Sequence, residues 1–201
     1  MRARRAAILA GGLSRRMGSP KAAVALNGLP LISYPLAAAR AAGLEPVVVA
    51  KADSALPPLD CEVLVEDASD PHPLNGIVTA LERGPGPQVV LACDVPLVPP
   101  ALLAELARRD APLVVPADPR PQPLVARWDP ALLDRLRAAI TTGEPLVRLV
   151  AELGAEAIAG AELRTFGDPA EMFANVNDPA GLEAAERLLG GQSGTSSTRA
   201  L

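Results

Sequence analysis

Two adjacent glycines, two arginines and a lysine follow the first apolar stretch, in the segment LAGGLSRRMGSPK (9–21). Glycine allows the backbone to bring its N–H groups close to a ligand, and a concave row of such groups binds phosphate oxygens. The charged side chains would add full positive charges for a polyphosphate. The segment therefore indicates a site for a nucleoside triphosphate, and an ordinary glycine turn with solvated arginines is the alternative. The residues concerned are Gly11, Gly12, Arg15, Arg16 and Lys21.

Two familiar nucleotide-binding motifs are absent from this segment. The P-loop spacing, in which Gly-Lys-Ser/Thr follows an earlier glycine by five residues, does not occur. The dinucleotide fingerprint G-x-G-x-x-G is excluded as well, because the two glycines here are adjacent. A triphosphate would have to be bound by a different kind of loop.

A second chemical feature is the carboxylate of Asp94, which follows the apolar run Val89–Ala92 and precedes a proline. Magnesium needs only one or two carboxylates in addition to substrate phosphates and water. Asp94 is therefore a candidate Mg²⁺ ligand that would stabilise charge on a reacting phosphate. The alternative is a turn or a helix cap ahead of Ala101.

Apolar runs alternate with stretches of helical periodicity along the chain. The predicted strands are Ala6–Leu9, Val47–Ala50, Val63–Val65, Val89–Ala92, Leu113–Val115 and Leu124–Trp128. The predicted helices are Leu31–Ala42, Ile77–Leu81, Ala101–Arg109, Ala131–Ile140, Pro145–Leu153 and Pro179–Leu189. This alternation predicts an α/β fold with a mostly parallel sheet and helices on both faces. In such sheets ligands bind at the carboxyl ends of strands, where both chemical features lie.

Composition limits the class of protein. The chain has 201 residues, which suits a single domain, expected over residues 1–190 with a disordered tail at 191–201. Its formal net charge of −4 gives no basic field for nucleic acid or anionic lipid. Cys61 and Cys93 have neither zinc spacing nor a disulfide framework, and no stretch reaches the length of a membrane span. We expect a soluble, cytoplasmic protein without nucleic-acid or membrane partners.

Several segments together resemble the MobA family of molybdenum cofactor guanylyltransferases, within the nucleoside-triphosphate transferases. The resemblance extends to about Leu189. The segments that carry it are LAGGLSRRMGSPK (9–21), EDASDPHPLNGI (66–77), ACDVPLVPP (92–100), PQPLVARW (121–128) and FANVNDPAGL (173–182). It implies a Rossmann-like fold of the nucleotide-diphospho-sugar transferase type. It also implies transfer of GMP from GTP to molybdopterin, or to molybdopterin that already carries molybdenum, with Mg²⁺ as cofactor and pyrophosphate as product.

The resemblance also suggests roles for particular residues. Lys21, Asp94 and Arg16 would be catalytic, with Asp94 also the metal ligand. The nucleotide would contact Leu9, Ala10, Gly11, Gly12, Lys21, Asp67 and Asp94. The pterin substrate would lie near Gln122, Arg148, Asn175 and Asn177. Glu66 is assigned a structural role. A molybdenum-insertion enzyme and an apo-molybdoenzyme are the implied protein partners.

Three positions depart from the family pattern. Pro20 precedes the lysine where an aspartate is usual, and His72 replaces the first glycine of Gly-Pro-Leu-x-Gly. Ala50 stands where an asparagine often holds the nucleotide, so nucleotide recognition at this point is either lost or supplied from elsewhere, and the preference for guanine follows less directly than nucleotide transfer. His72, the only histidine, is interpreted as a surface residue in preference to a general base. Open alternatives are the same chemistry with CTP or a sugar phosphate, and a nucleotide-binding protein without catalytic activity.

Overall fold

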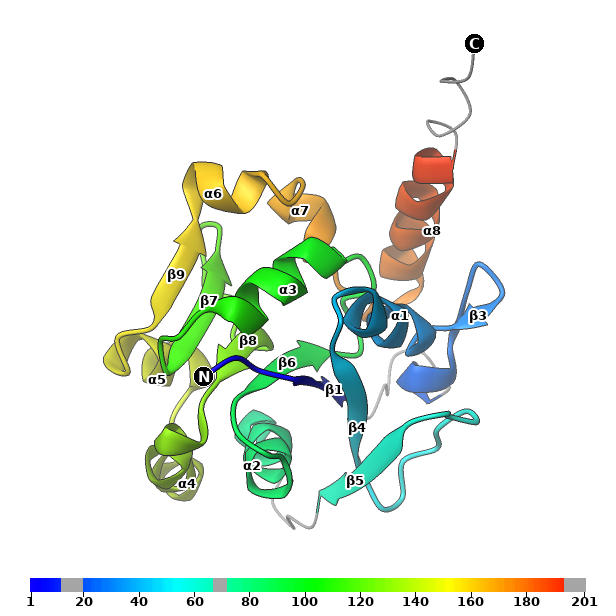
Figure 1. Cartoon of the computed structure of the whole chain (residues 1–201). Helices are drawn as coiled ribbons and strands as arrows, with labels where there is room; N and C mark the ends of the chain where they lie inside the picture. Colours follow the sequence, from blue (N-terminus) through cyan, green and yellow to red (C-terminus); the bar gives the residue numbers. More distant parts are fainter. Residues whose placement is uncertain (12–19, 67–71, 194–201) are drawn as a thin grey trace.

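The computed structural model describes residues 1–11, 20–66 and 72–193, and within them it shows a seven-stranded sheet between layers of helices (Figure 1). The strand order across the sheet is β5-β4-β1-β6-β8-β7-β9. The strands are β1 (Arg5–Leu9), β4 (Glu45–Lys51), β5 (Glu62–Glu66), β6 (Gln88–Ala92), β7 (Leu113–Ala117), β8 (Val125–Trp128) and β9 (Glu156–Ala159).

β1 lies inside the sheet and pairs in parallel with β4 and β6. Its side chains alternate between the two faces, so that Ile8 belongs to one buried cluster and Ala7 to the other. Both are fully buried. A strand buried on both faces needs an uninterrupted apolar run, which explains why this segment is recognisable in the sequence.

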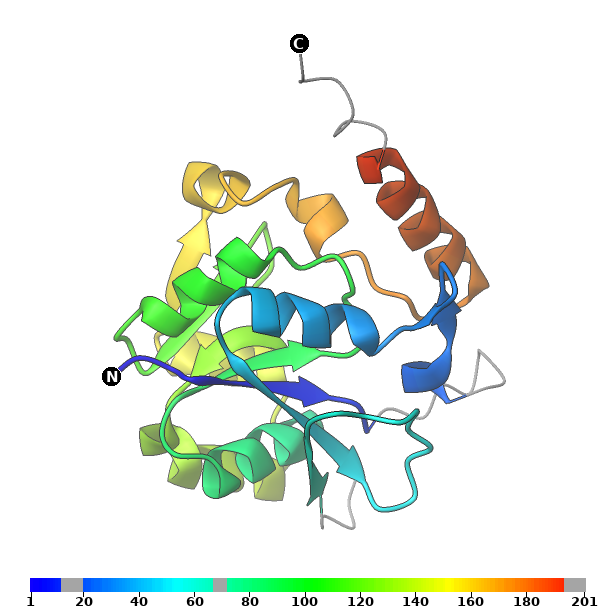
Figure 2. The same cartoon turned by 45° about the vertical axis from the view of Figure 1, so that its right-hand side comes forward.

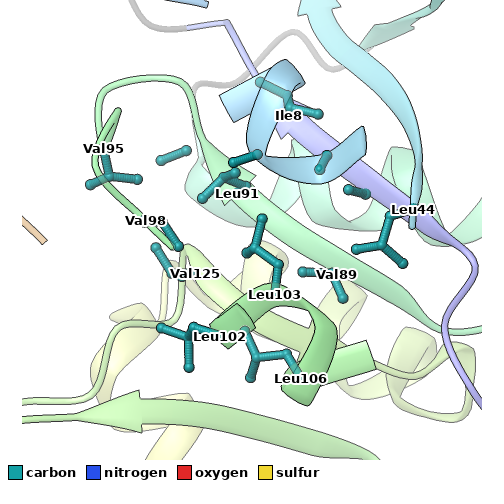
Figure 3. Packing of buried hydrophobic residues seen from close by; sticks show 14 of the residues in the cluster. Ile8, Leu44, Val89, Leu91, Val95, Val98, Leu102, Leu103, Leu106 and Val125 are labelled. Carbon is teal, nitrogen blue, oxygen red and sulfur yellow. The ribbon is translucent and has the colours of Figure 1, made fainter. Parts of the chain in front are cut away.

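The first face of the sheet is covered by α1 (Ser33–Ala41) and α3 (Pro100–Arg108), which lie above the sheet in Figure 1. α3 presents Leu102, Leu103 and Leu106 to the strands, and all three are fully buried (Figure 3). Val89 and Leu91 of β6 face the same cluster. Burial of these branched side chains holds α3 in place and fixes the connection that follows β6.

The second face is covered by α2 (Pro73–Arg83), α4 (Leu133–Thr142) and α5 (Leu146–Glu152). Leu74 and Ile77 of α2 pack against Ala7, Val47 and Val49. α2 is therefore fixed beneath the ends of β1, β4 and β5, where the helix begins beside the carboxyl edge of the sheet (Figure 2).

A small third cluster joins an early segment of the chain to a late one. The hairpin of β2 (Ala25–Leu26) and β3 (Leu29–Pro30) packs on α8 (Pro179–Ser193), and the cluster consists of Leu26, Leu31 just after the hairpin, Val176 just before α8, and Ala185. The hairpin and α8 lie side by side in both views (Figures 1 and 2). The Tyr34 hydroxyl adds a hydrogen bond of 2.7 Å to the Leu26 carbonyl oxygen. This cluster positions the residues on either side of it.

The predicted α/β fold with a mostly parallel sheet is confirmed, and each predicted strand and helix is present with shifts at its ends. β8 is antiparallel to β6 and β7. β9, the hairpin, α6 (Gly160–Arg164) and α7 (Pro169–Met172) were not anticipated, because these elements are short and carry little periodicity. α8 continues to Ser193, so residues 191–193 of the expected tail are helical, and 194–201 lie outside the described residues.

In the part of the chain that the structure describes, no helix is long and apolar enough to cross a membrane. Among the helices of the described residues the longest is α8, which has 15 residues, whereas a membrane span needs about 20. Its apolar side chains are used instead against the hairpin.

Truncation of a core side chain should show how strongly the first face is packed. Leu103→Ala leaves a cavity beneath α3, and we expect it to lower the free energy of unfolding by about 2–5 kcal/mol. Urea denaturation followed by the fluorescence of Trp128, the single tryptophan and fully buried, measures this change. Leu29→Ala, at a side chain 55% exposed, is the control and should change stability by no more than about 0.5 kcal/mol. Equal effects of the two substitutions would contradict the described packing.

Candidate active site

An ion pair between Lys21 and Asp94 lies at the carboxyl edge of the sheet. The Lys21 Nζ atom is 2.5 Å from Asp94 Oδ2, and the two side chains are only 15% and 25% exposed. Asp94 follows β6, the neighbour of β1 in the sheet. This contact is consistent with the expectation that Lys21 and Asp94 belong to one site. Asp94 does not cap a helix, because α3 begins at Pro100 with Pro99 as its N-cap, but it does lie in a turn, which was the other half of the alternative interpretation.

Asn177 joins this ion pair from the far end of the chain. The Lys21 ammonium donates a hydrogen bond to Asn177 Oδ1 as well as to Asp94. The preceding peptide is held too, since the Val176 N–H donates to the Asp94 carbonyl oxygen at 2.9 Å. One ammonium group is thus bound by a carboxylate and an amide oxygen, a pair of hard oxygen donors at the end of β6.

The position of Lys21 is set by the 3₁₀ turn η1 (Lys21–Ala23) and the hairpin that follows it. Ile32 N–H donates to the Ala22 carbonyl oxygen at 3.2 Å, and Leu31 N–H donates to the Val24 carbonyl oxygen at 2.7 Å. Leu31 also belongs to the cluster that contains Val176. The same apolar cluster therefore anchors the segments that carry Lys21 and Asn177.

The end of β1 contributes less to ligand binding than the sequence predicts. The Ala10 N–H donates to the Val49 carbonyl oxygen at 2.8 Å, and the Leu9 carbonyl oxygen accepts from Cys93 N–H at 3.1 Å. The Ala10 N–H is therefore not free to donate to a nucleotide, because it is already bonded to the neighbouring strand, and contact of Ala10 with the nucleotide stays a prediction. A phosphate-binding row of N–H groups can begin no earlier than Gly11.

Glu66, which was predicted from the sequence to be structural, lies beside Gly11. Glu66, at the end of β5, is half-buried, and burial raises the pKa of its carboxyl group. The positive charge of Lys51 and a hydrogen bond from the Asn75 side chain oppose that rise. Asn75 is 5% exposed and lies in the first turn of α2. The sequence gives one signal for a shared position of Glu66 and Lys51: each directly follows a predicted strand, and the carboxyl ends of these parallel strands lie at the same edge of the sheet.

Three of the four expected pterin contacts lie at this edge. Asn175 and Asn177 are exposed on either side of the buried Val176, as the alternation in an extended segment predicts. Gln122 is half-buried in the connection between β7 and β8, where its N–H donates to the Pro116 carbonyl oxygen at 2.8 Å. This connection meets the end of β6, since Ala92 N–H donates to the Leu124 carbonyl oxygen.

The structure does not bring Arg148 to the group around Lys21. Its side chain is 73% exposed on α5, and its Nε atom pairs with Glu152 Oε1 at 2.9 Å. α5 lies beside α4, whereas the turn that carries Lys21 lies next to β3 on the other side of the molecule (Figure 1). Four further predicted residues lie outside the described ranges, namely Gly12, Arg15, Arg16 and Asp67.

Two residues near the site act as helix caps. His72 Nδ1 accepts a hydrogen bond from the Leu74 N–H at 3.2 Å and begins α2, so this side chain has a structural use that the sequence reading did not anticipate. Asp178 Oδ1 accepts from the Gly181 N–H at 2.8 Å and begins α8, as its position before Pro179 predicts. The two asparagines that precede Asp178 are therefore not needed to cap the helix.

The donor set fits Mg²⁺ better than a transition metal. Within the described residues there is no group of three or more His, Cys, Asp and Glu side chains that could hold a metal by protein ligands alone. Asp94 offers a carboxylate and Asn177 an amide oxygen at one point. Magnesium binds through one or two such oxygens when substrate phosphates supply the others.

Comparison with known proteins identifies the family of this chain. The sequence profile of the MobA-like NTP transferase domain matches residues 6–161. The chain belongs to this family. It is therefore a nucleotidyltransferase by class, and the matched range contains Lys21, Glu66 and Asp94.

Similar proteins cover nearly the whole chain. A probable molybdenum cofactor guanylyltransferase of Chloroflexus aggregans is 31% identical over 91% of this chain and 93% of its own. A molybdenum cofactor guanylyltransferase of Sinorhizobium fredii is 32% identical over 92% and 91%. The crystal structure of molybdopterin-guanine dinucleotide biosynthesis protein A from Archaeoglobus fulgidus superposes with a TM-score of 0.80 at 27% identity, covering 93% and 99%.

The reactivity of the two thiols should separate structural cysteines from chemical ones. Burial raises the pKa of Cys93 to about 12 and the Asp94 carboxylate adds to the rise, so the thiolate is scarce at neutral pH. Cys61 is only half-buried, although burial raises its pKa as well. We expect iodoacetamide to modify Cys61 in the native protein and Cys93 only after unfolding, as measured by mass spectrometry. Rapid native modification of Cys93 would mean that the end of β6 is open to solvent.

Proposed function

We propose that the protein transfers GMP from GTP to molybdopterin, with or without bound molybdenum, and releases pyrophosphate. The proposal is supported by membership of the MobA-like NTP transferase family and by relatives named molybdenum cofactor guanylyltransferase. The observation that carries it is the convergence of Lys21, Asp94 and Asn177 at the carboxyl edge of the sheet. The unit responsible would be residues 1–190.

The chemistry needs alignment and charge stabilisation more than proton transfer. An oxygen of the acceptor's terminal phosphate would attack the α-phosphorus of GTP and form a new P–O bond. The bond from the α-phosphorus to the bridging oxygen would break, and pyrophosphate would leave with the electron pair. Because a phosphate monoester is largely ionised at neutral pH, no side chain has to act as a general base. This is consistent with the structural use of His72 as a helix cap.

Lys21 would interact with the triphosphate and hold it in line with the acceptor. Its ammonium group is already fixed by two oxygens, so little reorganisation is needed when phosphate oxygens approach. Arg16 and Asp67 are proposed to assist in nucleotide binding together with Leu9, Gly11 and Gly12. For Ala10 the proposal is limited to packing beneath the nucleotide, since its N–H is bonded within the sheet.

Mg²⁺ is the proposed cofactor, and Asp94 would hold it through its carboxylate, while the Asn177 amide oxygen stays bound to the Lys21 ammonium. When bound, the ion would neutralise charge on the reacting phosphates. Asp94 is suited to this because its carboxylate lies at the end of β6 and its backbone is tied to Val176. The backbone of Asp94 is thereby held by β6 before it and by the hydrogen bond from Val176.

The acceptor would lie on the β8 side of the ion pair. Gln122 and Asn175 are proposed as its polar contacts, since both lie at this edge beside the end of β6. Arg148 is not retained in this group, because α5 lies elsewhere. A molybdenum-insertion enzyme and an apo-molybdoenzyme are the proposed partners. The free thiols Cys61 and Cys93 favour a reducing cytoplasmic location.

Removal of the Asp94 carboxylate should abolish most of the activity. We expect Asp94→Ala to lower turnover by about a hundredfold or more, because a metal ligand contributes several kcal/mol to the barrier. The assay follows pyrophosphate release and dinucleotide formation from GTP and molybdopterin, with Mg²⁺ or with EDTA. Asp134→Ala, at a fully exposed carboxylate of α4, is the control. The proposal fails if wild-type protein forms no product from GTP, or if product is formed equally well in EDTA.

Asn177 should act on the nucleotide through Lys21. We expect Asn177→Ala to weaken GTP binding about threefold to tenfold, because the ammonium loses one of its two oxygen partners. Calorimetric titration of GTP without acceptor measures this. Asn175→Ala should leave GTP affinity unchanged and raise the KM for molybdopterin. If both variants affect only the acceptor, Asn177 has no part in positioning Lys21.

A further inference from the structure

A second group of residues lies at the same edge of the sheet, and its polar members have no part in the chemistry described above. It consists of Gly11, Lys51, Glu66, Asn75 and Gly76, which come from the ends of β1, β4 and β5 and from the start of α2. The charged members are half-buried. Charges at such positions lose solvation, so their presence requires an explanation.

Two glycines leave room in front of the Glu66 carboxylate. A methyl group on Gly11 would lie 3.8 Å from Glu66 Oε2 and 3.7 Å from Lys51 Cγ. A methyl group on Gly76 would lie 3.5 Å from the same carboxylate oxygen and 3.0 Å from Leu9 Cδ2. A side chain at either glycine would therefore narrow the space beside Glu66 Oε2, and the absence of side chains at both positions suits the close approach of a flat ligand.

The arrangement of charge is directional. Glu66 is an acceptor when ionised, and its two oxygens have more acceptor capacity than the hydrogen bond from Asn75 uses. Lys51, its register partner in the adjacent strand, supplies a donor beside it. Asn75 is buried and fixes the carboxylate orientation from α2. A ligand that matches this edge must present two neighbouring donors and, next to them, an acceptor.

The distance from the phosphate group suits a nucleotide. The strand order β5-β4-β1-β6 puts Glu66 three strands away from Asp94 along the carboxyl edge. At the usual spacing of neighbouring strands this is about 14 Å. An extended nucleoside triphosphate with its phosphates at Lys21 would cross the end of β1 and bring its base to β4 and β5.

We propose that Glu66 and Lys51 read the Watson–Crick edge of guanine, an inference that rests on the proposed use of GTP. The carboxylate accepts from guanine N1–H and from the 2-amino group, and the ammonium donates to O6. Adenine is rejected, because it has an acceptor at N1 and a donor at C6. This pair supplies the base recognition that Ala50 cannot provide, since an alanine side chain has no hydrogen-bonding group.

A single substitution tests the pair through a change of base preference. Glu66→Gln keeps the shape of the side chain but replaces one acceptor oxygen by an NH₂ donor. We expect wild-type protein to bind GTP about tenfold to a hundredfold more tightly than ITP, which lacks the 2-amino group. In Glu66→Gln this ratio should collapse towards one, and XTP, whose 2-carbonyl oxygen can accept from the new amide, should bind more tightly than it does to wild type. The readout is calorimetric titration of GTP, ITP and XTP with Mg²⁺ and no acceptor.

Controls separate this inference from the fold and from the proposed function. Glu171→Gln, at an exposed glutamate of α7, should keep the wild-type ratios. Unfolding followed by Trp128 fluorescence shows whether Glu66→Gln is folded. Lys51→Met gives a second variant that should weaken the binding of GTP, ITP and XTP alike, because all three carry the O6 acceptor. If wild type binds GTP, Glu66→Gln keeps the wild-type base ratios and Lys51→Met keeps the wild-type affinities, the inference is overturned and the proposed function stands. If wild type binds CTP in preference to GTP, the assignment of guanine is overturned in the inference and in the proposed function alike.

Discussion

The contact between the Lys21 ammonium and the Asp94 carboxylate is the interaction on which the site depends. It joins residues separated by 73 positions, and the third partner, Asn177, lies 156 positions after Lys21 in the chain. No local sequence pattern can create such a contact. It forms because the sheet fixes the end of β6, while the hairpin and α8 fix the two segments beside it. The core of the protein thus acts as a scaffold for one ammonium group.

Much of the fold could be predicted because buried strands need continuous apolar residues. β1 and β6 are buried on both faces, so their sequences identify them. β9 escaped prediction because its burial is set by neighbours and not by its own composition: only Ile158 of this strand is fully buried. Asp94 could be located because it directly follows a recognisable strand. Lys21 could be assigned a charge but not a partner.

Glu66 shows where reasoning from sequence stops. An acidic residue in a loop-rich segment is usually solvated, and nothing in its neighbours along the chain says otherwise. Its half-buried state depends on α2 packing beneath β1 and β5, and on the absence of side chains at Gly11 and Gly76. Ala10 is the converse case. Its place in a glycine-containing loop suggests a free N–H, but the sheet extends one residue further and uses it.

The reversed direction of β8 has a consequence for how such a molecule can diversify. Because β8 runs antiparallel to β6, β8 begins at the edge of the sheet where β1, β4 and β5 end. The segment containing Gln122, which leads into β8, therefore lies at that edge. In the proposed reaction, the residues that bind the nucleotide and those that bind the acceptor would thus come from separate stretches of chain on opposite sides of β6. Insertions or exchanges in the 118–124 connection would alter which phosphate-bearing molecule is accepted while leaving the nucleotide half intact. One scaffold of this kind can therefore serve many acceptors through changes in a single loop.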